Sequence, residues 1–358
     1  MIMHDHLQFM SQAVALAAKG RDTVSPNPMV GCVIVRDQQI IGQGYHQYSG
    51  GPHAEVIALQ QAGSAAKGAT AYVTLEPCCH QGKTPPCTLA LIAAGIKKVV
   101  IACIDPNPLV QGKGVASLRA AGIEVHAGVQ KEEAEKLNEI FFHYMRTKQP
   151  FVIAKWAMSL DGKTVVNQDD DRGISGNESL QHAHQLRQQC DAILVGATTV
   201  LDDNPKLTAR PANPTYPIRQ PLRIILAGQN KLPANAQIFN DDGQTIIAIT
   251  THNQHLYEGF PAVNTEFLLL PANEQCQVSL PALLTELGRR GITSLLVEGG
   301  MTTHHHFFKE DLVNRVHAYL APTVIASHAS KQFYQDMTIE RLGSDYLFSV
   351  NAKETRHV

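Results

Sequence analysis

A repeated alternation of short apolar runs with helical segments most strongly constrains how this chain can fold. Runs at 31–35, 71–75 and 99–104 are separated by segments whose apolar residues recur at helical spacing. The alternation begins again with FVIAKWAMSLDG at 151–162 and AILVGATTV at 192–200, and continues through LRIILA and TIIAIT. A helix expected near 280–289, LLVEGG and the run RVHAYLAPTVI at 315–325 follow. Strands that alternate with helices favour a mostly parallel sheet with helices on both faces. We therefore predict an α/β fold.

Two domains are expected from the length and from a break near position 149. A chain of 358 residues is long for one domain when a domain averages about 150 residues. Residues 131–148 read as one amphipathic helix whose acidic first turn and basic last turn suit the helix dipole. This helix meets Gln149-Pro150, and proline disfavours a helical residue before it. We place the domains at 1–147 and 148–358 and expect a long functional loop at 204–221.

Charge, hydropathy and cysteine content narrow the functional classes. The chain carries 30 Lys plus Arg against 32 Asp plus Glu, a formal net charge of -2, which argues against a binder of nucleic acid or anionic membranes. The opening MIMHDHLQFM lacks the basic region of a secretory signal, and no apolar run approaches the ~20 residues of a membrane span. We therefore expect a cytoplasmic protein. Four of the seven Cys lie between Cys78 and Cys103, and clustered thiols in a reducing compartment indicate metal binding or catalysis.

The sharpest local pattern is PHAEVIAL followed by EPCCHQGKTPPC. His53 and Glu55 stand at the start of a predicted helix, and Cys78 follows the end of a predicted strand. Zinc takes nitrogen and sulfur ligands in a tetrahedron, and a catalytic site keeps the fourth position for water. A Glu two residues from a ligand, and not itself a ligand, is what an activated water needs as a proton shuttle.

The two parts of this pattern resemble the signature of the zinc-dependent cytidine deaminase superfamily, which is H-x-E followed by P-C-x-x-C. Here no Cys completes the C-x-x-C, and the later TPPC is similar to the pattern of riboflavin-pathway pyrimidine deaminases. The resemblance implies His53, Cys78 and Cys87 as zinc ligands and Glu55 as the catalytic residue, with Cys79 and His80 as competing ligands. SPNPMVGCVIV looks like the family's strand at the substrate edge, which implies that Asn27 contacts the pyrimidine; a turn Asn between two prolines is the alternative.

A nicotinamide site is implied in the second half without the usual dinucleotide fingerprint. GQGYHQ and GKGVAS lack the third Gly of that fingerprint. AKWAMSLDGKT, GATTVLDDNPKLTAR and LLVEGGMTTHHHFF instead resemble the riboflavin-specific reductase domain, which is related in fold to dihydrofolate reductase. A strand that ends in EGG and runs into a helix exposes backbone N–H groups, a natural place for cofactor phosphates.

The reductase resemblance also implies individual contacts. Arg187 and Arg210 suit a ribose phosphate because a guanidinium can bind two phosphate oxygens at once. The alternative for Arg187 is a solvent-exposed position on a helix without a functional role. Lys155 is expected to polarise the sugar end that accepts hydride. The remaining substrate contacts are Asp171, Leu207 and Glu298, and the NADPH contacts are Ala157, Gly173, Thr199, Asp203, Gly300, Met301, Thr302, Thr303, His304, His305 and His306.

Two departures from the reductase pattern affect these expectations. Gly173 stands where the family usually shows an aromatic residue, after three consecutive Asp, which bears on the contacts of Gly173 and Asp171. The chain ends at ETRHV, where relatives continue into a final strand, so we expect one sheet edge to be incomplete.

Together the resemblances identify the chain as a member of the bifunctional deaminase/reductase family of riboflavin synthesis. They imply a cytidine-deaminase-like three-layer sandwich followed by a dihydrofolate-reductase-like domain, with Zn²⁺ and NADPH as cofactors. The implied reaction is hydrolytic deamination of 2,5-diamino-6-(5-phosphoribosylamino)pyrimidin-4(3H)-one, followed by reduction of its ribosyl group to ribityl. We expect a homo-oligomer, a dimer or tetramer, with a small-molecule substrate and no nucleic-acid or membrane partner. The alternatives are a nucleobase or nucleoside deaminase with an unrelated second domain, and a zinc-stabilised interaction module.

Overall fold

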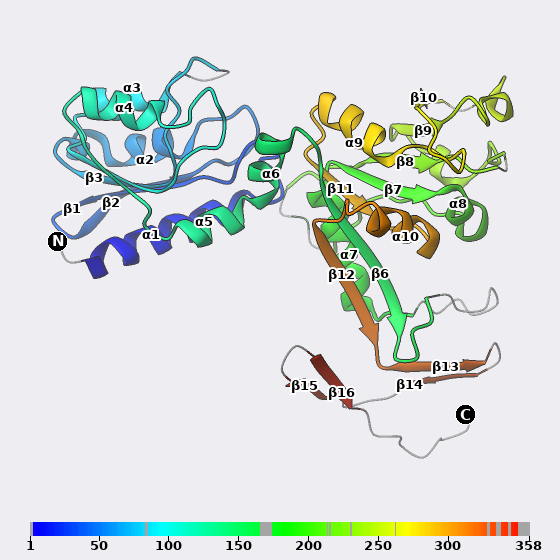
Figure 1. Cartoon of the computed structure of the whole chain (residues 1–358). Coiled ribbons are helices and arrows are strands. Elements are labelled where there is room, and N and C mark those ends of the chain that lie inside the picture. The colour runs from blue at the N-terminus through cyan, green and yellow to red at the C-terminus, as the bar shows by residue number, and fades with distance from the viewer. Residues whose placement is uncertain are drawn as a thin grey trace.

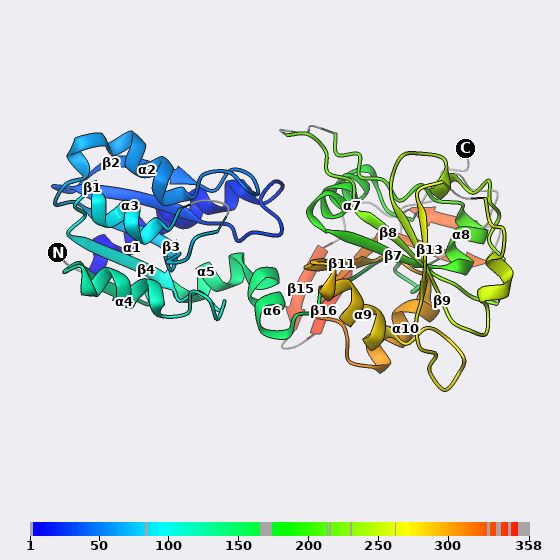
Figure 2. The same ribbon diagram turned by 90° about the horizontal axis from the view of Figure 1, so that it is seen from above.

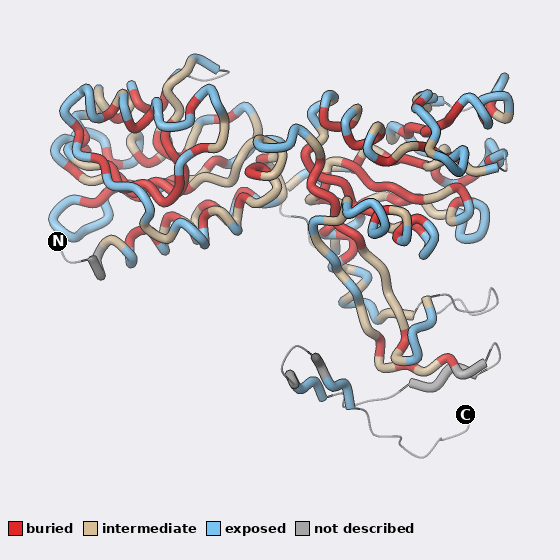
Figure 3. Tube along the Cα trace, in the orientation of Figure 1, coloured by how far each residue is buried: buried red, intermediate tan, exposed pale blue. Residues whose placement is uncertain are grey.

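Two α/β domains lie side by side in a computed structural model of the chain (Figures 1 and 2). The structure describes residues 3–82, 85–164, 174–212, 214, 216–229, 231–261, 263–327, 330–333, 338–342 and 345–349. The strands are buried in the middle of each domain, and the helices expose their outer faces (Figure 3). None of the described helices has the length and apolar character that a membrane span requires.

The first domain is a three-layer sandwich around a five-stranded sheet of order β2-β1-β3-β4-β5. The strands β3, β4 and β5 are parallel, and β1 pairs antiparallel with both β2 and β3. The elements are α1 (Met3–Ala17), the 3₁₀ helix η1 (Ala18–Gly20), β1 (Gly31–Arg36), β2 (Gln39–Tyr45), α2 (Ala54–Ala62), η2 (Gly63–Ala66), β3 (Thr70–Leu75), α3 (Cys87–Ala93), β4 (Lys98–Cys103), α4 (Lys113–Ala120), β5 (Glu124–Ala127), α5 (Lys131–Leu137) and α6 (Glu139–Thr147).

Each face of this sheet packs against its own set of helices. Ala58 of α2, Leu91 of α3 and Leu118 of α4 belong to one buried cluster. Met10 of α1 and Ala134 of α5 belong to the cluster on the opposite face. Figure 1 shows α2, α3 and α4 above the sheet and α1 and α5 below it. The predicted cytidine-deaminase-like sandwich is therefore confirmed.

The second domain contains a seven-stranded sheet of order β10-β9-β8-β7-β11-β6-β12, in which every neighbouring pair is parallel. Its elements are β6 (Phe151–Ser159), α7 (Asn177–Gln189), β7 (Ala192–Gly196), α8 (Ala197–Asp203), β8 (Leu222–Leu226), η3 (Gln237–Phe239), β9 (Thr245–Ile249), η4 (Gln254–Tyr257), β10 (Thr265–Leu269), α9 (Leu280–Arg289), β11 (Ser294–Val297), α10 (Met301–Lys309) and β12 (Arg315–Ala321). Two hairpins follow, β13 (Thr323–Ser327) with β14 (Ser330–Phe333), and β15 (Thr338–Leu342) with β16 (Asp345–Ser349).

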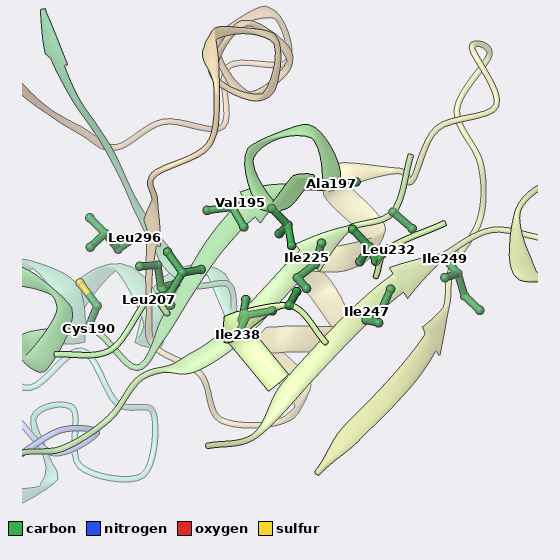
Figure 4. Packing of buried hydrophobic residues seen from close by; sticks show 14 of the residues in the cluster. Cys190, Val195, Ala197, Leu207, Ile225, Leu232, Ile238, Ile247, Ile249 and Leu296 are labelled. Carbon is green, nitrogen blue, oxygen red and sulfur yellow. The ribbon is translucent and has the colours of Figure 1, made fainter. Parts of the chain in front are cut away.

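Neighbouring residues on the central strands contribute to opposite faces of this sheet, because side chains alternate along a strand. Ile225 packs toward α7 and α8, in the cluster that also holds Leu232 and Ile247 (Figure 4). Ile224 belongs to the other cluster, which includes Leu283 of α9. A parallel sheet with helices on both faces confirms the predicted α/β architecture.

The structure differs from the sequence expectations at three places. The helix expected at 131–148 is interrupted at Asn138, whose side chain accepts a hydrogen bond from Met29 N at 2.7 Å and donates one to Met29 O at 2.8 Å. The end of the apolar run at 192–200 forms α8 instead of continuing as strand. The run at 315–325 is divided between β12 and β13 around Pro322, because proline removes a donor from a strand.

The proposed domain boundary lies in the short connection between α6 and β6. The helix α6 ends at Thr147 and β6 begins at Phe151, on either side of the proposed break between 147 and 148. A Cβ on Gly288 of α9 would lie 1.9 Å from Lys148 O, so this helix packs directly on the connecting backbone. The part of the chain after 349, which includes ETRHV, lies outside the described residues.

Candidate functional site

One imidazole and two thiols from distant parts of the sequence meet in the first domain. The ligand atoms of His53, Cys78 and Cys87 all lie within 4.8 Å of one another. The Nδ1 atom of His53 is 3.1 Å from Cys87 Sγ and 3.5 Å from Cys78 Sγ. Ligand atoms around a tetrahedral zinc are roughly 3.5 Å apart. Both the donor chemistry and the spacing therefore fit zinc.

Local structure explains how these three side chains are brought together. His53 is the residue that precedes α2, Cys87 opens α3, and Cys78 lies in the loop after β3. Backbone groups join the two cysteine segments, because Cys87 N donates to Cys78 Sγ at 3.3 Å and Thr88 N donates to Cys78 O at 3.2 Å. A hydrogen bond from Cys87, together with one from His53 and against the effect of burial, lowers the pKa of Cys78 to about 4. Cys78 is thus prepared to act as a thiolate, the form that binds metals.

The two competing ligands lie outside this cluster. The Sγ atom of Cys79 donates to Leu109 O at 3.9 Å, and neither Cys79 nor His80 belongs to a metal-compatible group among the described residues. This arrangement favours the set that contains Cys87.

Glu55 lies beside the cluster in the first turn of α2 and is only 3% exposed. It is not part of the metal-compatible group. Burial, and then the nearby Cys78, raise the pKa of Glu55 to about 7. A carboxyl group with a pKa near neutrality can both accept and release a proton, which is what proton transfer in catalysis requires.

Glu76 supports the loop that carries Cys78. Its buried carboxylate accepts hydrogen bonds from Gly112 N at 2.9 Å, Val115 N at 3.0 Å and Asp105 N at 3.3 Å. The first two donors lie at the start of α4, where backbone N–H groups lack partners within the helix. Glu76 therefore ties the loop after β3 to α4 and to the loop after β4.

We expect Gly114→Ala to disturb the group of His53, Cys78 and Cys87, although Gly114 is not part of that group. A Cβ at position 114 would lie 2.2 Å from Pro77 O, directly before Cys78. The backbone at Pro77 must move, so we expect a ten- to hundredfold loss of zinc affinity and a loss of about 1–3 kcal/mol of stability. Competition with a zinc chelator measures the first effect. Ala116→Ser, at an exposed position of α4, is the control and should leave zinc affinity unchanged.

A cavity of about 390 Å³ opens onto the cluster. Its lining includes Gly291 from the second domain and, from the first domain, His53, Glu55, Cys78, Pro26, Asn27 and Pro28. The cavity thus extends to the boundary between the domains.

His46, Asp105 and Asn107 line the same cavity, and His46 was not among the site residues expected from the sequence. His46 Nδ1 is 3.0 Å from Pro52 O, and its Nε2 is 3.0 Å from Asn27 Nδ2. Burial lowers the pKa of His46, which favours the neutral ring. Because a carbonyl can only accept, Nδ1 carries the proton and Nε2 accepts from Asn27. Only the position of His46 directly after β2 could have suggested this residue.

The second domain has a buried ionic cluster at the carboxyl end of β11. Glu298 accepts two hydrogen bonds from Arg187, from Nε at 2.8 Å and from Nη2 at 2.9 Å, and Lys155 Nζ lies 3.6 Å from Glu298 Oε2. Burial alone would raise the pKa of Glu298, but Arg187 and Lys155 hold it below its ordinary value. Arg187 also donates to Thr208 O at 3.2 Å. These bonds use three of the five N–H donors of Arg187.

Several of the residues expected to bind cofactor lie at the start of α10. Gly300 precedes this helix, and its N donates to Thr199 Oγ1 of α8 at 3.1 Å. A Cβ on Gly299 would lie 2.8 Å from Thr303 Cβ, so only Gly allows this close approach. The N-cap residue of α10 is Gly300, which has no side chain to cap the helix, so N–H donors at its start can meet phosphate oxygens. The backbone therefore fits the phosphates of NADPH.

The other expected residues of the second site occupy different environments. His304 is fully buried against Trp156, with ring centroids 5.4 Å apart, and Leu207 is buried in the core. Arg210 is exposed and donates to Thr208 Oγ1. The structure exposes Asp203, Met301, Thr302 and His305, leaves Ala157 and His306 half-buried, and buries Thr303. Asp171 and Gly173 lie outside the described residues.

Two family models match the chain. The model of the cytidine and deoxycytidylate deaminase zinc-binding region matches residues 3–103. The RibD C-terminal domain model matches residues 150–356.

Full-length relatives match both domains in the same order. The chain is 43% identical over 327 residues to the riboflavin biosynthesis protein RibD of Actinobacillus pleuropneumoniae, covering 91% of this chain and 86% of the relative. The structure of Acinetobacter baumannii RibD is similar with a TM-score of 0.82 at 37% identity, covering 99% of this chain and 100% of that one. A diaminohydroxyphosphoribosylaminopyrimidine deaminase/5-amino-6-(5-phosphoribosylamino)uracil reductase from Thermotoga maritima has a TM-score of 0.78 at 36% identity, covering 97% and 98%.

Proposed function

Because the chain belongs to the RibD family of bifunctional deaminase/reductases of riboflavin biosynthesis, we propose specific roles for the residues of its two sites. The deaminase domain and the reductase domain of this family fit Zn²⁺ and NADPH, respectively. The match of the second half excludes the alternative of an unrelated second domain. The observation that carries the proposal is the group of His53, Cys78 and Cys87 beside a buried Glu55 that is outside the group.

The first site would perform the hydrolytic deamination of 2,5-diamino-6-(5-phosphoribosylamino)pyrimidin-4(3H)-one. Zinc, when bound, supplies a Lewis acid that makes water more acidic, as NADPH in the second site supplies a hydride. Glu55 takes a proton from the attacking water at its carboxylate and passes it to the amino nitrogen, which leaves as ammonia. A pKa near 7 supports both halves of this transfer.

Asn27 would hold the pyrimidine in the first cavity. Its amide nitrogen is engaged by His46 Nε2, which leaves the side-chain oxygen as an acceptor for an amino group of the substrate. The loop at 26–28 lines the cavity, which supports this role. His46 would act through Asn27 by fixing the orientation of its amide.

The second site would reduce the ribosyl group to ribityl. We assign the cofactor phosphates to the start of α10, together with Thr199 and the other cofactor contacts that the resemblance implied. Lys155 is held against Glu298 and lies 5.3 Å from the ring centroid of Tyr319, so its position over the sugar would be fixed. Arg210, which is exposed, and the two remaining donors of Arg187 would bind the substrate phosphate. Asp171, Leu207 and Glu298 remain the proposed contacts along the rest of the substrate.

A coupled assay tests both activities in one protein. Zinc-loaded chain supplied with the diaminopyrimidinone phosphate and NADPH should release ammonia and oxidise NADPH in equal amounts. NADPH oxidation should stop when the zinc is removed and return when the deaminated intermediate is supplied directly. Well-folded, metal-loaded protein that shows neither activity would contradict the proposal.

The proposed cellular setting is a cytoplasmic homo-oligomer, a dimer or tetramer, without nucleic-acid or membrane partners. The near balance of basic and acidic residues supports the absence of a nucleic-acid partner. β12 ends the seven-stranded sheet and exposes 45% of Val316, which supports association with a second copy. Light scattering on the purified chain should give a mass at least twice 39.0 kDa.

A further inference from the structure

A side chain of the second domain holds the loop that lines the deaminase cavity. Ser25 Oγ, from the loop between η1 and β1, donates to Asp191 Oδ1 at 2.6 Å. Asp191 belongs to the second domain and lies between α7 and β7. A second bond joins the same two segments, because Gln189 Nε2 donates to Asp22 Oδ1 at 2.9 Å. The reductase domain therefore contacts the deaminase at its substrate loop.

Asp191 is a rigid anchor for this contact. Its side chain is 8% exposed, and its Oδ1 also accepts from Arg219 Nη1 at 2.7 Å. The other oxygen accepts from Thr293 N at 2.7 Å and Thr293 Oγ1 at 2.6 Å. Burial by itself would raise the pKa of Asp191, but Arg219, Ser25 and Thr293 hold it below its ordinary value. The acceptor offered to Ser25 is thus an ionised carboxylate in a fixed position.

The loop held by Asp191 carries the proposed substrate contact. Pro26, Asn27 and Pro28 follow Ser25 directly and line the cavity. On the far side of Asn27, the backbone of Met29 is fixed by Asn138, within the first domain. The loop is therefore held at both ends, at Met29 by its own domain and at Ser25 by Asp191, where a backbone bond from Asn27 N to Val24 O at 2.8 Å adds to the contact.

We propose that Asp191 of the reductase domain is a positioning residue for the deaminase, acting through Ser25 to keep Asn27 in its substrate-binding position. This inference rests on the proposed role of Asn27 in the first site. Without the bond from Ser25, the loop populates positions that do not bind substrate, and the apparent affinity falls by the fraction that remains competent. The free energy needed to return the loop to its binding position lowers the affinity for substrate, so KM rises and the rate at saturation stays unchanged.

Ser25→Ala tests the contact from the deaminase side without altering any residue of the reductase domain. We expect KM for deamination to rise about tenfold, the size expected when a hydrogen bond to a charged group is lost. The kcat of deamination, the zinc content and the reduction of separately supplied deaminated intermediate should stay unchanged. Ser25→Thr, which keeps a hydroxyl, should restore most of the affinity.

Two further variants distinguish positioning from general contact between the domains. Tyr216→Phe removes the hydrogen bond between the hydroxyl groups of Tyr45 and Tyr216, 3.1 Å apart, which joins the domains without involving the loop at 25–29, and should leave KM unchanged. In an Asp191→Asn background, Ser25→Ala should raise KM much less than in the parent protein, because the two residues share one bond. An unchanged KM in Ser25→Ala, a fall confined to kcat, or an equal rise of KM in Tyr216→Phe would overturn the inference. A parent protein without deaminase activity would instead refute the proposed function.

Discussion

Replacement of Glu55 by Gln is expected to reduce deamination by a factor of roughly 10²–10⁴ while zinc stays bound. Gln has the same shape as Glu but cannot accept the proton from water and deliver it to the leaving nitrogen. Glu55 is 3% exposed and is not in the metal-compatible group, so the substitution should disturb neither the fold nor the ligands.

The Glu55→Gln experiment needs three readouts from the same preparation. Ammonia release should fall, whereas zinc content and NADPH oxidation with supplied intermediate should match the parent protein. Glu132→Gln, at an exposed position in the first turn of α5, is the matched control and should keep full activity. Loss of zinc from the Glu55→Gln protein would show that Glu55 is a ligand, and retained deamination would remove it from the mechanism. A zinc-stabilised interaction module would keep all its functions in this variant.

Glu298→Gln is expected to destabilise the second domain by about 3–5 kcal/mol and to abolish reduction. The carboxylate of Glu298 is 7% exposed and compensates the charges of Arg187, at 2.8 Å, and Lys155, at 3.6 Å. The neutral amide of Gln no longer compensates the buried charges of Arg187 and Lys155. Its NH₂ group is also a hydrogen-bond donor and faces the N–H donors of these two residues. The substitution should also release Lys155 and Arg187 from the positions in which we propose that they contact the substrate.

The single Trp of the chain makes this effect measurable in one domain. Trp156 lies on β6 and packs against Phe308 with ring centroids 6.2 Å apart, so its fluorescence reports unfolding of the second domain. Denaturant titrations should show a lower midpoint for Glu298→Gln, while deamination is retained. Glu266→Gln breaks a surface ion pair with Arg290, in which Glu266 is 51% exposed, and should cost no more than about 1 kcal/mol. Equal midpoints for the two variants would contradict the account.

Much of the fold could be predicted because burial leaves a clear pattern in the sequence. The strands near 31–35 and 71–75 and the helix at 280–289 were expected from apolar periodicity and correspond to β1, β3 and α9. Asn138 could not be expected to interrupt a helix, because its partner Met29 is distant in the sequence. Periodicity describes one segment at a time and contains no information about such long-range hydrogen bonds.

The first site was more predictable than the second for a similar reason. His53 and Glu55 lie two residues apart at the start of one helix, and the chemistry of zinc restricts which residues can complete the site. In contrast, the tie between Arg187 and Glu298 joins residues that lie far apart along the chain, and each alone resembles an ordinary charged residue. The contact of Ser25 with Asp191 also depends on how the two domains pack, which no local pattern records.

X-ray absorption at the zinc edge tests the central claim most directly. The zinc-loaded protein should hold one zinc per chain, with two sulfur ligands, one imidazole nitrogen and one light atom from solvent. Cys87→Ser should lower the sulfur count to one, whereas Cys79→Ser and Glu55→Gln should leave the spectrum unchanged. A spectrum that loses an oxygen ligand in Glu55→Gln, or one that keeps two sulfurs in Cys87→Ser, would contradict the assignment of the metal site.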